Sequence, residues 1–340
     1  MTARSSLSGG GPSLRDLGLH ELALLLLALN GAVLIATVPF YRSFGLLLDW
    51  ATFAPSLIAI GFAGIGWLAH RSTPGRASEW TTAETFVAFS LFALLFSVVT
   101  PAQYLAVAMN RPLADPWLAR ADAALGISVP DVVAWTSAHP RLVSILVVSY
   151  YSLAVQFIAA IVLLGLYYRD RDALWEYVFN FHVCLILTLI GLALFPAMCA
   201  FSYYGFESLI DQTRFIRHFD ALRRGTFTVL QLKELEGLIT FPSFHVAGGL
   251  MVTWAFRRYH WMLAAMLVLN TLMIASTVLL GPHYAVDLIA SAVVFGTSAW
   301  LYSRWGRQLA GSRSVTPGVV AAVDAGADQV VQRHEAIHGR

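Results

Sequence analysis

Long apolar runs constrain the fold of this chain more than any other feature of its sequence. Eight stretches contain few charged side chains, and each is close to the roughly 20 apolar residues that a bilayer-spanning helix needs. The predicted spans cover residues 20–40, 46–69, 84–109, 141–168, 176–204, 241–258, 261–281 and 282–303. We therefore expect an all-α membrane protein, a polytopic bundle of about eight transmembrane helices.

The composition supports this class and argues against others. Of the 340 residues, 58% are hydrophobic and 12% are charged, whereas about 25% of the residues of a soluble domain are charged. The net charge is only +2, and no aromatic–basic motif is present, so we expect no nucleic-acid partner. Cys184 and Cys199 fall in one predicted span, about 22 Å apart if helical, which excludes a disulfide within it.

The arginines predict the orientation, because short cytoplasmic loops carry an excess of them. With eight spans both termini lie on one side, and the other side has Arg42 and two long loops, residues 110–140 and 205–240. The side of the termini holds Arg4, Arg15, Arg71, Arg76, Arg169, Arg171, Arg257, Arg258, Arg304, Arg307 and Arg313. We therefore expect cytoplasmic termini. A chain rich in alanine and arginine, with Lys233 as its only lysine, further suggests a bacterial plasma membrane.

The two long loops differ in character. In residues 110–140, apolar side chains recur at helical spacing, which predicts a helix lying in the outer interface. These side chains are Leu113, Trp117, Ala121 and Leu125. The loop of residues 205–240 carries more basic residues than any other loop, namely Arg214, Arg217, Arg223, Arg224 and Lys233.

Polar residues concentrate at the ends of apolar segments between residues 241 and 289. The sequence reads Pro-Ser-Phe-His at 242–245 and Gly-Pro-His-Tyr-Ala-Val-Asp at 281–287. Ionisable side chains at such positions indicate a functional site, because burying them in a membrane is costly. His245 begins the sixth predicted span and His283 stands between the seventh and eighth, so both are predicted on the outer face.

These residue types suit attack on a phosphoryl group. His283 and Asp287 are four residues apart and share one helical face, so the carboxylate can hold one imidazole nitrogen and leave the other free to attack. His245 can serve as general acid and then base. Ser243 can donate to a phosphate oxygen together with the amides at the start of the sixth helix.

Each residue also has a structural interpretation. A histidine at a membrane boundary can simply be solvated, Ser243 can act as an N-cap, and Asp287 can pair with an arginine. The combination of both motifs on one face favours the catalytic interpretation. A metal site is not favoured, because this stretch offers two histidines and one aspartate where zinc needs three or four ligands.

At these residues the sequence resembles the type-2 phosphatidic acid phosphatase superfamily. Its Pro-Ser-x-His motif matches residues 242–245, and its second motif, Ser-Arg followed after five residues by His-x-x-x-Asp, matches Ser276, His283 and Asp287 in spacing. The resemblance covers about residues 84–303. It implies that His283 becomes a phosphohistidine, that Asp287 orients it, and that His245 is the acid and base, with no metal or other cofactor.

The resemblance also implies a division of the chain. Residues 1–83 would hold two extra transmembrane helices, residues 84–305 a six-helix catalytic membrane core, and residues 306–340 a tail. The tail has no apolar periodicity, so we expect it to be disordered and cytoplasmic.

The sequence departs from the family pattern in its positive charges. Thr277 replaces the arginine after Ser276, and no upstream Lys-(six residues)-Arg-Pro motif is present. A phosphate dianion needs positive partners, and arginine suits it best. The loop of residues 205–240 can supply them, with Arg223 and Arg224 as first choice and Arg214 and Arg217 behind.

The missing arginine, the pair His283–Tyr284 and the pair Phe195–Pro196 resemble the inositol-phosphorylceramide synthase branch, which transfers a phospho-alcohol headgroup between lipids. The predicted function is therefore cleavage of a lipid phosphate ester at the outer face through phosphohistidine, with water or a lipid or polyol as acceptor. The alternatives are a headgroup transferase of that branch and a non-catalytic lipid-binding or transport protein.

Overall fold

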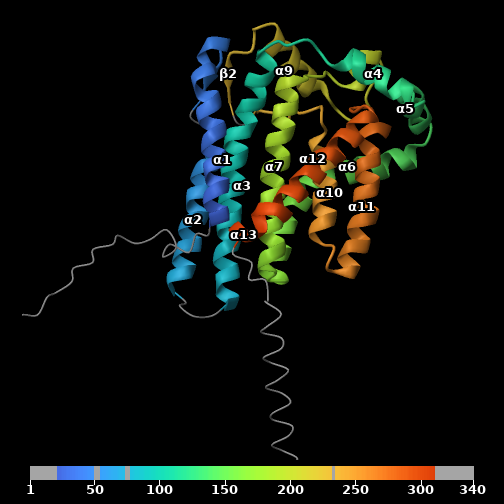
Figure 1. The fold of residues 1–340 in the computed structure, drawn as a ribbon. Helices are drawn as coiled ribbons and strands as arrows, with labels where there is room; N and C mark the ends of the chain where they lie inside the picture. The colour runs from blue at the N-terminus through green and yellow to red at the C-terminus, as the bar shows by residue number, and fades with distance from the viewer. Residues whose placement is uncertain (1–20, 50–53, 73–76, 232–233, 311–340) are drawn as a thin grey trace, which may run out of the picture.

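The computed structural model describes residues 21–49, 54–72, 77–231 and 234–310. Within them a long helix lies in each of the eight predicted spans (Figure 1). These are α1 (Glu21–Thr37), α2 (Ala54–Ser72), α3 (Ala77–Ala108), α6 (Pro140–Val162), α7 (Arg171–Leu194), α10 (Phe244–Ala255), α11 (His260–Leu279) and α12 (Val286–Leu301). Six are long and apolar enough to cross a membrane, and α2 and α10 contain shorter apolar segments. The prediction of an all-α polytopic membrane protein is confirmed.

Shorter elements connect these helices. They are α4 (Asp115–Ala124), α5 (Val129–Ser137), α8 (Ala200–Tyr204), α9 (Thr213–Arg223) and α13 (Arg307–Leu309), with 3-10 turns at Val38–Phe40 and Arg42–Phe44 and π-helical turns at Leu163–Tyr167 and Tyr302–Gly306. Two strands, β1 (Leu47–Leu48) and β2 (Val229–Leu230), pair in parallel and join the segment after α1 to the segment after α9. Strands of two residues are too short for a sequence pattern, so this pairing was not predicted.

The centre of the bundle is aromatic. Phe181 of α7 has its ring centroid 3.8 Å from that of Phe92 of α3 and 4.9 Å from that of Phe157 of α6. The helix α10 packs against α6, α7, α11 and α12, whereas α1 and α2 pack against α3. The two N-terminal helices therefore pack on one side of the other long helices, next to α3. The division of the chain at residue 84 stays a prediction.

Ion pairs tie the helices together at one end of the bundle. Arg171 Nε, at the start of α7, lies 2.7 Å from Glu84 Oε2 of α3. Arg257 Nη2, after α10, lies 2.7 Å from Glu176 Oε2 of α7. Both carboxylates are buried, and a buried charge needs such a partner. The pairs fix α3, α7 and α10 at the end opposite to α4, α5 and α9.

The fifth predicted span, residues 176–204, is too long. The helix α7 ends at Leu194, and Cys199 stands before the separate helix α8. Proline lacks an amide hydrogen and disfavours helical geometry in the residue before it, so Pro196 ends the span. The prediction that one span holds both cysteines is therefore wrong, and both are free thiols.

The loop of residues 110–140 forms two helices, and α4 turns an unexpected face inward. The predicted apolar positions Trp117 and Leu125 are 39% and 51% exposed. The buried face consists of Asp115, Leu118, Ala119 and Asp122. A face with two acidic residues therefore packs on the bundle, and the predicted apolar stripe lies at its edge, where the partly exposed Trp117 contacts Phe195 and Phe241.

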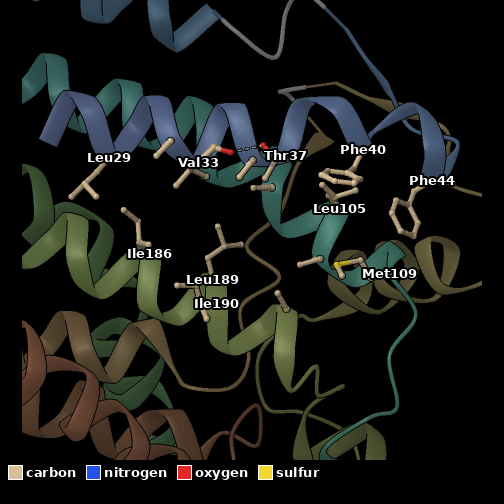
Figure 2. Close-up of a pocket in the computed structure, with 15 residues that line it drawn as sticks. Leu29, Val33, Thr37, Phe40, Phe44, Leu105, Met109, Ile186, Leu189 and Ile190 are labelled. Carbon is tan, nitrogen blue, oxygen red and sulfur yellow. Dashed lines mark hydrogen bonds between the residues drawn. The ribbon is translucent and has the colours of Figure 1, made fainter. Parts of the chain in front are cut away.

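An apolar groove of about 580 Å³ lies between α1, α3 and α7. Figure 2 shows Leu29 and Val33 of α1 opposite Ile186 and Leu189 of α7. Met109, just after α3, also lines the groove. The groove therefore reaches the end of the bundle on which α4 and α9 lie (Figure 1).

Candidate active site

His283 lies in the short connection between α11 and α12, which folds back over the end of α11. Its backbone N–H donates to Thr277 O at 3.0 Å. Gly281 has φ of +103°, which glycine tolerates and other residues rarely adopt. The turn brings His283 inward, so that only 3% of the residue is exposed.

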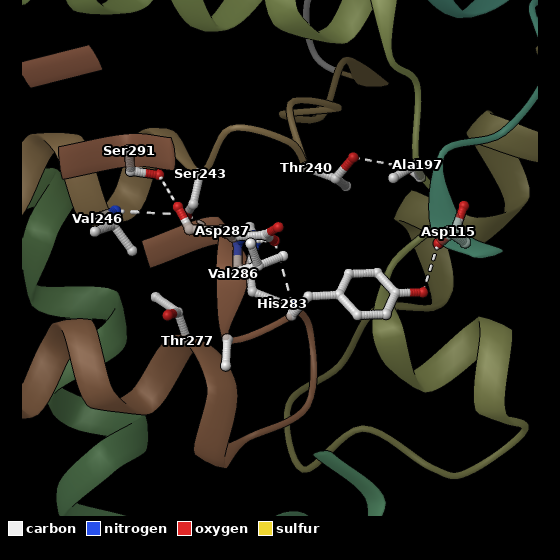
Figure 3. A network of polar contacts seen from close by, with 12 residues as sticks. Asp115, Ala197, Thr240, Ser243, Val246, Thr277, His283, Val286, Asp287 and Ser291 are labelled. Atoms are coloured by element: carbon white, nitrogen blue, oxygen red, sulfur yellow. Dashed lines mark hydrogen bonds and ion pairs between the residues drawn. The ribbon is translucent and has the colours of Figure 1, made fainter. Parts of the chain in front are cut away.

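His283 is held between Asp287 and Ser243 (Figure 3). Its Nδ1 lies 3.0 Å from Asp287 Oδ2, and its Nε2 lies 3.2 Å from Ser243 Oγ. A carboxylate only accepts hydrogen bonds, so the network assigns the proton to Nδ1 and leaves the lone pair on Nε2. Sequence reasoning expected Asp287 to hold one imidazole nitrogen of His283. The structure shows a hydrogen bond between them, and their catalytic roles stay a prediction.

Ser243 owes its position to the start of α10. Its Oγ caps the helix by accepting from Val246 N at 3.4 Å. Pro242 packs against Gly191 of α7 so closely that a Cβ at Gly191 would overlap its ring. This close contact with α7 fixes the start of α10, so that Ser243 lies beside His283.

His245 stands in the first turn of α10 and faces the same space. Its ring stacks on Tyr150 of α6, with centroids 4.5 Å apart and an interplanar angle of 18°. The ring centroid of His283 lies 6.3 Å away. The two imidazoles therefore line the same site, close enough for one ligand to contact both.

Burial sets the protonation state of His283. Loss of hydration on burial is the main cause that lowers its pKa, to about 4. The imidazole is consequently neutral at neutral pH, and a neutral imidazole is the nucleophilic form. Asp287 Oδ2 also accepts from Tyr284 N at 3.2 Å, which holds the carboxylate in line with the ring.

Sequence reasoning missed two aspartates of α4 that bind, from outside, the loop between α11 and α12 that carries His283. Asp115 accepts from Met198 N at 2.9 Å and, through Oδ1, from Tyr284 Oη at 2.9 Å. Asp122 accepts from Ala285 N at 2.9 Å and from Val286 N at 2.8 Å. The first amides of α12 thus receive their cap from another helix. Burial raises the pKa of both carboxyls, and these hydrogen bonds oppose it.

One signal for these aspartates was present in the sequence. Asp115 and Asp122 are seven residues apart and so share a helical face with Leu118. The contact of this face with the loop after His283 could not be read from the sequence, because its partners there, Tyr284, Ala285 and Val286, lie more than 160 positions further along the chain.

Two of the arginines proposed for phosphate binding contact groups other than the two histidines. Arg214 pairs with Glu236 at 2.7 Å, and Arg223 donates to Arg111 O at 2.8 Å. In the described residues neither these two nor the exposed Arg217 and Arg224 hydrogen-bonds to His283. Arg223 is linked to the site by its charge. Burial raises the pKa of Asp115, and Arg223 is among the groups that oppose this rise.

The position of the family arginine is occupied by a buried hydroxyl. Thr277 Oγ1 donates to Ile274 O at 2.7 Å, and Ser276 Oγ donates to Met273 O at 2.5 Å. Both hydroxyls are thus satisfied within α11. A positive charge for a phosphate must therefore come from outside this helix.

Comparison with known proteins found one family. The model of the PAP2 superfamily matches residues 116–301, which is more than half of the 340 residues. The matched range runs from α4 to α12 and contains Ser243, His245, His283 and Asp287. No curated protein and no solved structure matches the chain.

Proposed function

The chain belongs to the PAP2 superfamily, and from this we propose that it cleaves a lipid phosphate ester through a phosphohistidine intermediate on His283. Membership itself supports a function of the lipid phosphatase type. The observation that carries the finer proposal is the hydrogen-bonding of His283, with Asp287 on Nδ1 and Ser243 beside Nε2.

In the first half of the proposed reaction, Nε2 of His283 attacks phosphorus. The bond to the ester oxygen breaks, and His245 gives that oxygen a proton. His245 takes up this proton as the phosphate dianion binds beside it, because a nearby negative charge favours the protonated imidazole. Asp287 stabilises the cationic ring that results, as the orienting carboxylate does in a catalytic triad. The phosphate oxygens would accept from Ser243 and from the first amides of α10.

In the second half, His245 takes the proton of an acceptor hydroxyl. The acceptor oxygen attacks phosphorus, the N–P bond breaks, and His283 returns to its neutral form. With water the product is free phosphate, and with a lipid or polyol it is a new phosphoester. This half needs no residue beyond those of the first half, so the acceptor depends on what can enter the site.

A specific observation favours the headgroup transferase as second candidate. Ser243, His283 and Asp287 are 0%, 3% and 1% exposed, and a site that excludes water favours transfer to an alcohol over hydrolysis. A transferase of the inositol-phosphorylceramide synthase type would have this character. The further alternative, a non-catalytic lipid-binding or transport protein, leaves the orientation of His283 by Asp287 without a purpose.

One experiment tests the chemistry and separates the acceptors. Purified protein receives a lipid phosphate labelled on phosphorus, with and without a diacylglycerol or polyol, and is quenched in alkali, in which phosphohistidine survives. We expect a labelled histidine that disappears in His283→Gln and persists in His139→Gln, an exposed control at the same end of the bundle. Free phosphate identifies hydrolysis, and product formed only with the added alcohol identifies transfer. Label retained in His283→Gln would overturn the proposal.

Among the arginines we propose Arg223 as the first phosphate partner, because its charge reaches Asp115 beside the catalytic loop. Arg224, Arg217 and Arg214 follow, and Arg214 is engaged with Glu236. Arg223→Gln should raise KM about tenfold, whereas Arg214→Gln should change it less, since a charged hydrogen bond contributes about 1.5–3 kcal/mol. An unchanged KM in Arg223→Gln would refute this choice.

A further inference from the structure

The groove between α1, α3 and α7 can hold only hydrocarbon. Of its 15 lining residues Thr37 alone has a polar side chain. The Thr37 hydroxyl donates to Val33 O at 2.8 Å within its own helix. The lining side chains therefore offer no free polar partner to an occupant, which selects an alkyl chain.

The size of the groove suits one lipid chain. Its volume of about 580 Å³ lies within the range of about 300–1,000 Å³ that small-molecule sites occupy. From Leu29 to Thr37 it extends about 12 Å along α1, at about 1.5 Å per residue. The hydrocarbon of one leaflet is about 15 Å deep. The groove thus matches a chain that enters from a single leaflet.

The helix α7 is the wall that the groove shares with the candidate site. Ile190 and Ala193 face the groove, whereas Gly191 between them contacts Pro242, the neighbour of Ser243. The thickness of one helix, about 10 Å, therefore separates the two.

The positive charge of Arg223 is connected both to the groove and to the candidate site. Met109 lines the groove, and Arg111, two residues further on, accepts a hydrogen bond from Arg223 through its carbonyl oxygen. The charge of Arg223 acts on Asp115, and Asp115 binds Tyr284, the neighbour of His283. Arg223 therefore connects the apolar groove with the loop that carries His283. A lipid phosphate has matching parts, an alkyl chain followed by a phosphate group.

We propose that this groove holds a hydrocarbon chain of the lipid whose phosphate ester reacts at His283. The inference rests on the proposed function, because the groove would bind the alkyl chain of the same substrate whose phosphate is bound beside His283. The groove then selects substrates by chain length, and α1 belongs to the substrate site although it lies outside the residues matched by the family.

Two substitutions fill the groove from opposite walls, Ala193→Trp on α7 and Ala36→Trp on α1. The control Ala154→Trp lies on α6, where a separate shallow groove opens. The value of kcat/KM is measured with a palmitoyl and a butanoyl phosphatidic acid, after each variant has been checked for an unchanged elution profile. We expect both groove variants to lose about tenfold or more on the palmitoyl lipid, the scale at which apolar pockets discriminate. On the butanoyl lipid they should stay within about twofold, and the control should change neither.

A binding measurement separates failure of this inference from failure of the proposed function. A phosphatidic acid with a photoreactive group in its chain is crosslinked to the protein, and the labelled peptides are identified. Label on α1 and α7, reduced by Ala36→Trp, supports the groove even if the wild-type protein turns over neither lipid. Label confined to other helices, or equal loss of activity on both lipids in an active protein, overturns it.

Discussion

At the scale of single residues, the chemistry depends on which nitrogen of His283 is free. Asp287 binds Nδ1 and Ser243 faces Nε2, so one tautomer is favoured before any substrate arrives. A pKa of about 4 keeps the ring neutral. An aqueous histidine would be partly protonated near neutral pH, so burial provides the reactive form.

Asp287→Asn tests this orienting role. An amide can donate to the ring and favour the wrong tautomer, so we expect kcat to fall about 10²–10⁴-fold while KM changes little. Steady-state kinetics on a lipid phosphate measure both constants. A rise in KM with kcat unchanged would show that Asp287 contributes to binding and not to orientation.

The residues proposed as catalytic could be picked out from the sequence because their spacing is local. His283 and Asp287 are four apart, and Ser243 and His245 share the first turn of a helix, so each pair follows from helix geometry. The partners of Asp115 and Asp122 are remote in sequence, and only the folded chain brings them together. The motif alone was not sufficient at Thr277. It shows that the family arginine is missing at this position, but not which residue supplies the positive charge in its place.

At the scale of elements, α4 acts as a brace for the loop between α11 and α12, which carries His283. Its two aspartates bind both sides of the turn that follows His283. The backbone position of this loop is therefore fixed by α4, a short helix that is not one of the long spans. The apolar runs predicted the long helices because hydropathy and length determine them. They did not predict the early end of α7 at Pro196, nor the inward face of α4, because these depend on local backbone geometry and tertiary partners.

Asp122→Ala tests the brace. Two amides at the start of α12 lose their acceptor, so we expect a loss of about 2–6 kcal/mol of stability, at about 1–3 kcal/mol for each unsatisfied donor. The turn holding His283 then loosens, and kcat should fall about tenfold, the scale of a loss of about 1.4 kcal/mol. Thermal unfolding in detergent and kinetics measure the two effects. Asp131→Ala on the exposed face of α5 is the matched control, and an equal effect of both variants would contradict the brace.

At the scale of the whole molecule, the ion-paired end and the candidate site lie at opposite ends of the bundle. Arg171 and Arg257 stand at the first end and His283 at the second. The distribution of short-loop arginines led us to propose that the first end is cytoplasmic and that the site faces outward.

Labelling of single cysteines tests this orientation. A membrane-impermeant maleimide should modify Arg224→Cys in intact cells, and Gln308→Cys only after the cells are permeabilised. The native Cys184 and Cys199 are 0% and 3% exposed and give little background. Labelling of Gln308→Cys in intact cells, with Arg224→Cys protected, would reverse the proposed topology.

The position of α7 between groove and site has a consequence for how such a protein can diversify. The proposed reacting groups lie on one side of α7, within residues 116–301 that the family shares. The other walls of the groove come from α1 and α3, which precede that range. Substitutions in α1 can therefore alter the preferred lipid tail while the phosphoryl chemistry is inherited unchanged, so the two properties can evolve separately.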